Sequence, residues 1–471
     1  NGKPVILKAD GIVEVVYATT ITETLNASIS HQTAAAGRDV DIVFDPNNLN
    51  HFVAVYTEDA NNYRGKIVAG RISGTSLVFG ATTFINGNNR SWSKSIDFDP
   101  SGSGKFVVAW QNGTSGNYLQ AMVGTHSALS LSFGSVTTLY SGSVENINVA
   151  FNPALSGTFL ICFENHNEGK RKAATYSISG TTISADSEAD FSPNDQMGEY
   201  MDIAMDISSG KCGVVHSSPT SSYILRLSTV TISASNVASV NNSGIISSNY
   251  AYSYVSIASN PRVSGEWIIG FQDTNYYPRA RKASASTGDI GLGTQNVLTS
   301  SANGGQMTVK FLHTGTSRCV MLYENDANSS FRTFIKFNYS NLTVISTDIT
   351  SYKASAHLAF ACDPLFIGDR FILIWKDSIN SNKVAITMAQ YGSVETNLTT
   401  TNFVGTSTAA YTNGQTATVM LQGGVSTNQS SLAIGSNYFV QPDGTLATTA
   451  GNPSVEAGKA VSATTLLLKG I

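Results

Sequence analysis

The feature that most constrains this chain is a motif that recurs seven times at an almost constant spacing. Each copy is a mostly apolar run whose fifth residue is usually a large ring, as in FVVAW at 106–110. Successive fifth positions are separated by 52 to 55 residues. A fixed period of this length indicates an architecture built from repeated supersecondary units. The fifth positions are Tyr56, Trp110, Phe163, His216, Phe271, Tyr323 and Trp375.

A second apolar stretch precedes each run and ends in a turn. In five copies the turn begins with Asp or Asn followed by Pro, as in Asp99-Pro100. The side-chain oxygen of Asp or Asn can cap nearby backbone N–H groups, and Pro presets the dihedral angle that follows. The fourth and sixth copies lack the pair, so their turns are predicted to be the most irregular.

After each run come a polar loop and two further strand-like segments, as in KIVAGRIS (66–73) and SLVFGATTF (76–84). Each repeat therefore holds four strands in about 53 residues, joined by hairpin-sized turns. The second strand is apolar on both faces and must be covered on both sides. We expect an all-β fold in which residues 38–404 form a seven-bladed β-propeller of four-stranded antiparallel blades. A linear β-solenoid is the alternative, although its repeats are usually shorter.

The two flanks read as small β elements. Each carries an Asp-Gly pair between strand-like runs, at residues 10–11 and 443–444, and this pair suits tight hairpins because both residues tolerate positive φ. Residues 1–37 are expected to form a hairpin that either closes the ring or docks elsewhere. Residues 405–471 are expected to form a separate small β module.

The composition argues against several classes of function. Charged residues make up 13% of the chain, the formal net charge is −4, and no basic run suits a nucleic-acid backbone. The apolar stretches are far shorter than the roughly 18 to 20 residues of a membrane span. Four widely spaced cysteines contain no CxxC pair and are read as reduced thiols, three of them in the apolar strands. Partners among nucleic acids and insertion into membranes are not expected.

No catalytic constellation emerges from the residues. The seven histidines never show metal-ligand spacing, and the glycine-rich stretches match no nucleotide-binding loop. The SxDxGxTW box of sialidase-type propellers is absent. We predict no catalytic residue, no metal site and no cofactor; calcium binding by loops 58–62 or 324–328 is the alternative at those two places. Carboxylates at the ends of the second strands are interpreted as turn caps rather than a glycosidase pair: Glu58, Asp59, Glu164, Glu324 and Asp377.

A surface is left as the candidate site. The loops after the second and fourth strands of a blade emerge on one face, and aromatic residues stand there among Asn, Asp, Ser and Arg, as in QDTNYYPRAR (272–281). Such mixtures suit recognition of protein or carbohydrate. The alternative is that these rings pack between neighbouring blades. The candidate binding residues are Tyr63, Trp92, Tyr118, Tyr200, Tyr250, Tyr276 and Tyr277.

The flanks also resemble a known kind of protein. GKPVILKADGIVEVV (2–16) and SNYFVQPDGTLATTAGNPSVEAGKAVSATTLLLKG (436–470) are similar to segments of tail-fibre and other virion structural proteins of tailed, mainly marine, bacteriophages. This resemblance implies a non-enzymatic, multimeric virion component on the exterior of the tail or capsid, with other virion proteins, copies of itself and a host-surface glycan or protein as partners. A secreted or cell-surface lectin-like adhesin is the alternative, and a propeller glycoside hydrolase is less favoured.

Overall fold

The computed structural model comprises two compact units, which we describe separately. Residues 25–390 form the propeller unit, and residues 1–24 together with 391–471 form the terminal unit. The structure describes residues 2–8, 12–16, 25–59, 62–73, 76–87, 89–191, 200–218, 224–233, 236–247, 254–285, 290–300, 306–312, 318–362, 364, 369–379, 381–391, 398–409, 411, 416–441, 444–450 and 454–470.

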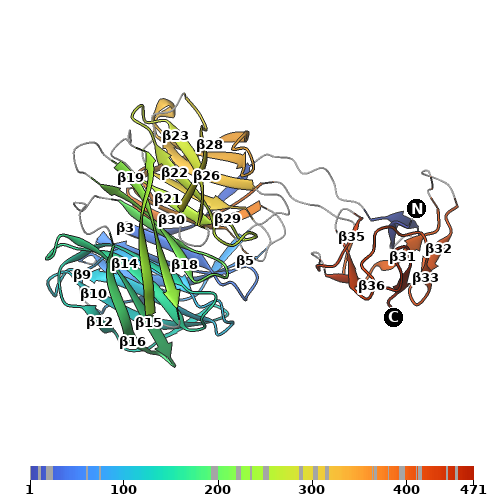
Figure 1. Ribbon diagram of the computed structural model, residues 1–471, viewed down its shortest axis with the longest axis horizontal. Coiled ribbons are helices and arrows are strands. Elements are labelled where there is room, and N and C mark those ends of the chain that lie inside the picture. The colour runs from blue at the N-terminus through green and yellow to red at the C-terminus, as the bar shows by residue number, and fades with distance from the viewer. Residues whose placement is uncertain are drawn as a thin grey trace. The chain divides into compact units, whose positions relative to one another are not determined.

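The propeller unit consists of antiparallel sheets in which strands pair with their neighbours in chain order (Figure 1). Three sheets have four strands each. They are β13 (Val144–Phe151), β14 (Thr158–Asn165), β15 (Lys170–Ser179) and β16 (Thr182–Phe191); β17 (Met201–Met205), β18 (Lys211–Ser218), β19 (Ile224–Ser233) and β20 (Asn236–Ser247); and β21 (Ser256–Ser259), β22 (Glu266–Gln272), β23 (Pro278–Ala285) and β24 (Ile290–Val297).

In a fourth sheet the outermost strand is interrupted, because two short strands both pair with the third strand. This sheet contains β8 (Ser91–Phe98), β9 (Lys105–Asn112), β10 (Tyr118–Ser127), β11 (Ser130–Phe133) and β12 (Thr137–Tyr140). The remaining strands form one continuous sheet: β25 (Met307–Phe311), β26 (Arg318–Asn325), β27 (Phe331–Asn338), β28 (Val344–Cys362), β29 (Asp369–Asp377), β30 (Lys383–Tyr391), β3 (Leu25–Phe44), β4 (His51–Glu58), β5 (Arg64–Ser73), β6 (Ser76–Phe79) and β7 (Thr83–Phe84).

Two long strands explain why that last sheet is continuous. The first part of β28 pairs with β27 and its second part pairs with β29, so one strand serves two successive repeats. In the same way β3 lies between β30 and β4 in the sheet. A strand from the start of the propeller unit is therefore hydrogen-bonded to a strand from its end, which closes the ring.

The second strand of each repeat forms the core. All seven fifth positions, including Trp110, are at most 3% exposed. The apolar clusters combine residues of neighbouring sheets, as when Val107 of β9 packs with Phe159 of β14. The expected all-β propeller architecture is confirmed, and Trp110 is a core residue between sheets. The count of seven blades stays a prediction from the repeats.

The predicted turn caps are formed. Oδ1 of Asp45 accepts a hydrogen bond from the backbone N–H of Asn47 at 2.9 Å. In the fourth copy, which lacks the proline, Oδ2 of Asp206 still accepts the N–H of Ser209 at 2.8 Å. The turns of the sixth and seventh copies lie wholly or partly outside the described residues. Further caps form at Asp99, Asn152 and Asn260.

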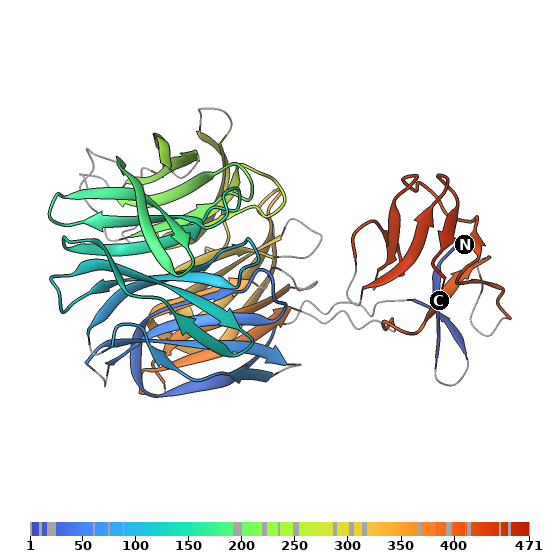
Figure 2. The same ribbon diagram turned by 90° about the horizontal axis from the view of Figure 1, so that it is seen from below.

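In the terminal unit, the two ends of the chain share one fold. Strand β1 (Pro4–Leu7) pairs on one side with β2 (Val13–Val15) and on the other with β31 (Phe403–Ser407), which pairs with β32 (Val419–Leu421). Figure 2 shows this N-terminal hairpin in blue among the red C-terminal strands. A second sheet contains β33 (Val425–Ser426), β37 (Leu466–Leu468), β36 (Val455–Ala460), β34 (Asn437–Val440) and β35 (Leu446–Ala447).

A common core holds the terminal unit together, since Ile6 and Val16 pack with Phe403, Val440 and Leu466. The division along the chain thus falls at residues 24 and 391, rather than at 37 and 404, because β1 needs β31 as its hydrogen-bonding partner. Among the described residues, no helix is long and apolar enough to cross a membrane.

Candidate functional site

A central cavity of about 830 Å³ lies in the propeller unit. The first strand of each of the seven repeats, called the innermost strand from here on, contributes residues to its lining. Most of the lining is apolar, but three carboxylates, Asp41, Asp97 and Asp202, and two lysines, Lys94 and Lys310, also belong to it. A cavity that holds ionisable groups is a candidate active site.

The cavity carboxylates bridge neighbouring innermost strands. Oδ1 of Asp97 accepts the N–H of Phe98 at 2.9 Å, and Oδ2 accepts the N–H of Phe151, on the next innermost strand, at 2.7 Å. Asp41 holds Ile42 and Ile96 in the same way. Asp202 accepts the N–H of Ile203 and Ile257 and the hydroxyl of Ser256.

Burial raises the pKa of these groups. The pKa of Asp97 rises to about 7 and that of Asp41 to about 6, with desolvation as the main cause and the backbone hydrogen bonds opposing it. A raised carboxyl pKa is also typical of a general acid. Here, however, both oxygens of each carboxylate already accept backbone N–H groups, which is the arrangement of a structural bridge.

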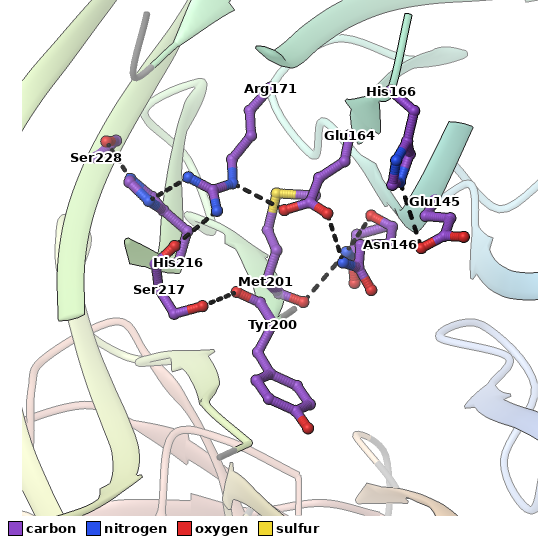
Figure 3. A network of polar contacts seen from close by, with 11 residues as sticks. Glu145, Asn146, Glu164, His166, Arg171, Tyr200, Met201, His216, Ser217 and Ser228 are labelled. Carbon is purple, nitrogen blue, oxygen red and sulfur yellow. Dashed lines mark hydrogen bonds and ion pairs between the residues drawn. The ribbon is translucent and has the colours of Figure 1, made fainter. Parts of the chain in front are cut away.

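A second polar cluster links β14, β15, β18 and β19 (Figure 3), and its members on these strands are at most 2% exposed. Arg171 is its centre. Its Nε contacts Oε1 of Glu164 at 3.0 Å, Nη2 donates to the carbonyl of Ser217 at 2.6 Å, and Nη1 lies 3.2 Å from Nδ1 of His216. The other Glu164 oxygen accepts the side-chain amide of Asn146 at 2.8 Å. The cluster resembles a catalytic arrangement because Nε2 of His216 lies 3.0 Å from the hydroxyl of Ser228.

The arginine decides what this histidine can do. Because a guanidinium only donates, Nδ1 of His216 must accept its hydrogen bond, and the ring proton of a neutral imidazole must sit on Nε2. Nε2 then donates to Ser228, so it cannot remove a proton from that hydroxyl. Burial and the charges of Arg171 and Arg226 hold the pKa of His216 well below its usual range. His216 is 0% exposed, so the cluster joins neighbouring sheets rather than meeting a substrate.

Two of the predicted binding residues lie together on the surface. The rings of Tyr63 and Trp92 meet edge to face with centroids 6.3 Å apart. The guanidinium of Arg90 lies 5.8 Å from the Tyr63 ring centroid. Both rings are half-buried. A loop residue after a second strand and a residue at the start of the next innermost strand thus form one aromatic and cationic cluster; Trp92 lies within β8 rather than in a loop after a fourth strand.

The other predicted residues are separate from that cluster. Tyr118 begins β10 and is half-buried. The ring of Tyr200 lies tilted against that of Tyr254, which lines the central cavity, with centroids 4.5 Å apart, so this ring packs within the propeller. Tyr276 is 52% exposed at the tip of the β22–β23 loop, and Tyr277 beside it is half-buried. Tyr250 lies outside the described residues.

The interpretation of the carboxylates at the ends of the second strands as turn caps is only partly correct. Asp377 caps a turn, since its Oδ1 accepts the N–H of Ile379 at 3.0 Å. The turn-cap interpretation is wrong for three glutamates, which instead pair with cations of the adjacent third strand: Glu58 with Lys66, Glu164 with Arg171, and Glu324 with Arg332. Antiparallel pairing brings the end of one strand against the start of the next, and the long glutamate side chain reaches across.

Sequence reasoning missed the cavity carboxylates. Asp41, Asp202 and Ser256 each stand four residues before the turn residue of their repeat, whereas Asp97 stands two residues before its own turn residue, Asp99. That periodicity was a usable signal for a bridging role. In the part of the chain that the structure describes, no three His, Cys, Asp or Glu side chains are grouped so that they could hold a metal ion.

No family model and no curated protein matches this sequence. Solved structures do match. The lectin BP39L from Burkholderia pseudomallei is similar with a TM-score of 0.52 at 8% identity, covering 77% of this chain and 99% of its own. AofleA from Arthrobotrys oligospora gives 0.46 at 9%, covering 70% and 91%. The β-propeller domain of the Trilobed protease from Pyrococcus furiosus gives 0.43 at 10%, covering 79% and 98%. The chain is thus a β-propeller protein, and at such identities the likeness extends to the fold alone.

Proposed function

We propose that this chain is a non-enzymatic component of the outside of a phage virion, as a tail fibre, a tail-tip part or a capsid appendage, and that its propeller contacts the host surface. The observation that carries the proposal is the terminal unit. The two flanks that resemble virion structural proteins are far apart in sequence but share one core through Ile6 and Leu466. A module built from both ends of the chain suits docking to other virion proteins and to copies of itself.

The propeller supplies the surface that would face the host. The cluster of Tyr63, Trp92 and Arg90 combines aromatic rings with a cation, the residue types that dominate recognition surfaces. A non-enzymatic role is supported by the two buried polar groups described above. The carboxylates of the cavity hold neighbouring strands, and Arg171 fixes His216 in the tautomer that cannot activate Ser228.

A lectin-like adhesin, secreted or on a cell surface, is the second candidate. Its support is that BP39L, the similar structure with the highest TM-score given above, is a lectin. Both candidates place the protein outside a cell and give it a host-surface glycan or protein as partner.

Immunogold electron microscopy with antibodies against the propeller unit separates the two candidates. We expect label on the exterior of virions, at the tail or the capsid. Purified particles that lack the protein would overturn the virion assignment and leave the adhesin. Incubation with an oligosaccharide library, followed by mass spectrometry, tests the enzyme question, because any new reducing end would contradict a non-enzymatic role.

Host binding is tested with a Tyr63→Ala, Trp92→Ala double variant. We expect its binding to host cells to fall severalfold, whereas Val78→Ala, an exposed apolar residue on β6, serves as the matched control. Unchanged binding of the double variant would place the contact elsewhere.

A further inference from the structure

One arginine stands where the repeat otherwise places a core residue. The third residue of each apolar run faces a partner on the third strand of its sheet. In the described repeats that partner is buried and apolar or small, except on β23, where Ile269 faces Arg281. The equivalent residues elsewhere are Val68, Met122, Ala174, Ser228 and Ile335, all at most 3% exposed. Arg281 therefore replaces core packing between two sheets.

A pocket of about 440 Å³ opens at this position. It lies between the last strand of one sheet, β20, and the edge of the next, which contributes the β22–β23 loop, β23 and β24. Its polar lining consists of Arg279, Arg281, Asp273, Gln295, Thr274 and Asn275, together with Ser247. Pockets of about 300–1,000 Å³ hold small-molecule ligands, so this one suits one or two sugar rings.

The charges in the pocket do not balance. Asp273 is already engaged, because its Oδ2 contacts Nε and Nη2 of Arg279 at 2.8 and 2.7 Å and its Oδ1 accepts the N–H of Asn275. Within the described parts of the chain, Arg281 donates to the carbonyls of Ile246 and Gly293 and to no other group. Among the described residues, no carboxylate pairs with Arg281.

The uncompensated charge of Arg281 raises the free energy of the ligand-free protein, and a bound anion would lower it. Arg281 is half-buried, and burial lowers the pKa of its guanidinium. A desolvated cation is stabilised by an anion that accepts hydrogen bonds from its planar fork, and a carboxylate fits that fork with two parallel bonds. Gln295 faces Arg281 directly on β24 and its amide has no hydrogen-bond partner among the described residues. It can donate to or accept from a hydroxyl.

We propose that this pocket binds an acidic sugar residue, with Arg281 holding the carboxylate and Gln295, Thr274 and Asn275 meeting the ring hydroxyls. Tyr276, the next residue along the same loop, is exposed and offers a ring to an adjoining sugar. The proposal rests on the proposed function in one respect, since it gives the host-surface contact a chemical class of ligand. It does not depend on whether the protein is a virion part or an adhesin.

The test is a glycan array that carries hexuronate and sialic acid oligosaccharides, their methyl esters and sulfated neutral oligosaccharides. We expect binding to at least one carboxylate-bearing glycan, loss of that binding in the matching ester, and a decrease of at least about tenfold in Arg281→Ile. Isothermal titration with the glycan found gives the affinities. Binding to sulfated glycans alone, or equal binding by Arg281→Ile, would overturn the proposal.

Arg281→Ile also separates binding from folding. Isoleucine is the residue at the equivalent position 335, so the variant should retain the melting temperature of the wild type or exceed it. A lower melting temperature would mean that Arg281 is structural and would count against the proposal. If neutral glycans bind and only Trp92→Ala abolishes that binding, the proposed host contact stands and the acidic pocket is wrong. If neither host cells nor any glycan bind, the proposed function itself fails.

Discussion

Two arginines on third strands meet opposite environments. Arg171 on β15 is 1% exposed and the chain surrounds it with Glu164, His216 and the carbonyl of Ser217. Phe191 covers the histidine, with ring centroids 5.8 Å apart. Arg281 on β23 is half-buried, lacks a carboxylate partner among the described residues and faces a pocket.

The difference shows how burial and pairing together separate a structural cation from a binding one. A charge removed from water must be compensated, and the chain does this itself at Arg171. At Arg281 the compensation is incomplete, so the binding of an external anion would be favourable. An arginine between two neighbouring sheets can therefore either hold the sheets together or form part of a binding site.

The largest effect on stability is expected when the Arg171 cluster loses the carboxylate of Glu164. Glu164→Ala removes the carboxylate that pairs with the buried Arg171, and breaking a buried pair in this way lowers the free energy of unfolding by about 3–5 kcal/mol. Urea denaturation followed by tryptophan fluorescence measures the change, since Trp110 and Trp267 are buried in the propeller unit.

A matched double variant tests the reason for that loss. Glu164→Leu with Arg171→Met removes both charges and should recover part of the stability, because no uncompensated charge is left, although Nδ1 of His216 and the carbonyl of Ser217 lose their donor. If the double variant is as unstable as Glu164→Ala, the loss comes from packing and not from the unpaired charge.

A smaller effect is expected from pH. The pKa of His216 is held below its usual range in the folded chain, so the unfolded chain takes up a proton first and the contribution of His216 to stability falls as the pH drops through about 6.5. Between pH 7.5 and 5.5 this amounts to about 1 kcal/mol. Asp41 and Asp97 act in the opposite sense over the same range, since a raised carboxyl pKa stabilises the fold at lower pH.

The contribution of His216 is isolated by difference. His216→Gln keeps an acceptor for Arg171 and a donor for Ser228 but does not titrate. Urea midpoints of the wild type and this variant should diverge as the pH rises from 5.5, with the wild type gaining relative to the variant. Parallel pH profiles would show that the titration of His216 does not contribute to the pH dependence of stability.

The smallest effect is expected in the pocket of Arg281, where a substitution should change the affinity for a glycan. Asp273→Asn removes one negative charge beside Arg279 and keeps an oxygen that can accept the N–H of Asn275. The binding of a carboxylate glycan should become roughly threefold tighter at low salt, and the gain should shrink as salt is added, because salt screens the repulsion between the glycan carboxylate and the pocket's negative charge. Weaker binding would indicate that Asp273 contacts the sugar or that the loop depends on its charge.

Much of the fold could be predicted because it is periodic. The apolar runs, the turn residues and the ring at every fifth position repeat along the chain, so Trp110 could be assigned to the core without coordinates. The candidate sites were less accessible. The pairing of Tyr63 with Trp92 joins a loop of one repeat to the next repeat, and the isolation of Arg281 is visible only when third strands are aligned by their register.

The sequence by itself determined the all-β architecture, the repeat and the capped turns, because these depend on contacts that are close in the chain and recur in every copy. Only the tertiary structure decided that both ends form one unit, that Glu164 binds Arg171 instead of capping a turn, and which tautomer His216 adopts. Those outcomes depend on which long side chains and strand edges meet across sheets, and the hydrogen bonds and desolvation that decide them arise only once the sheets have packed.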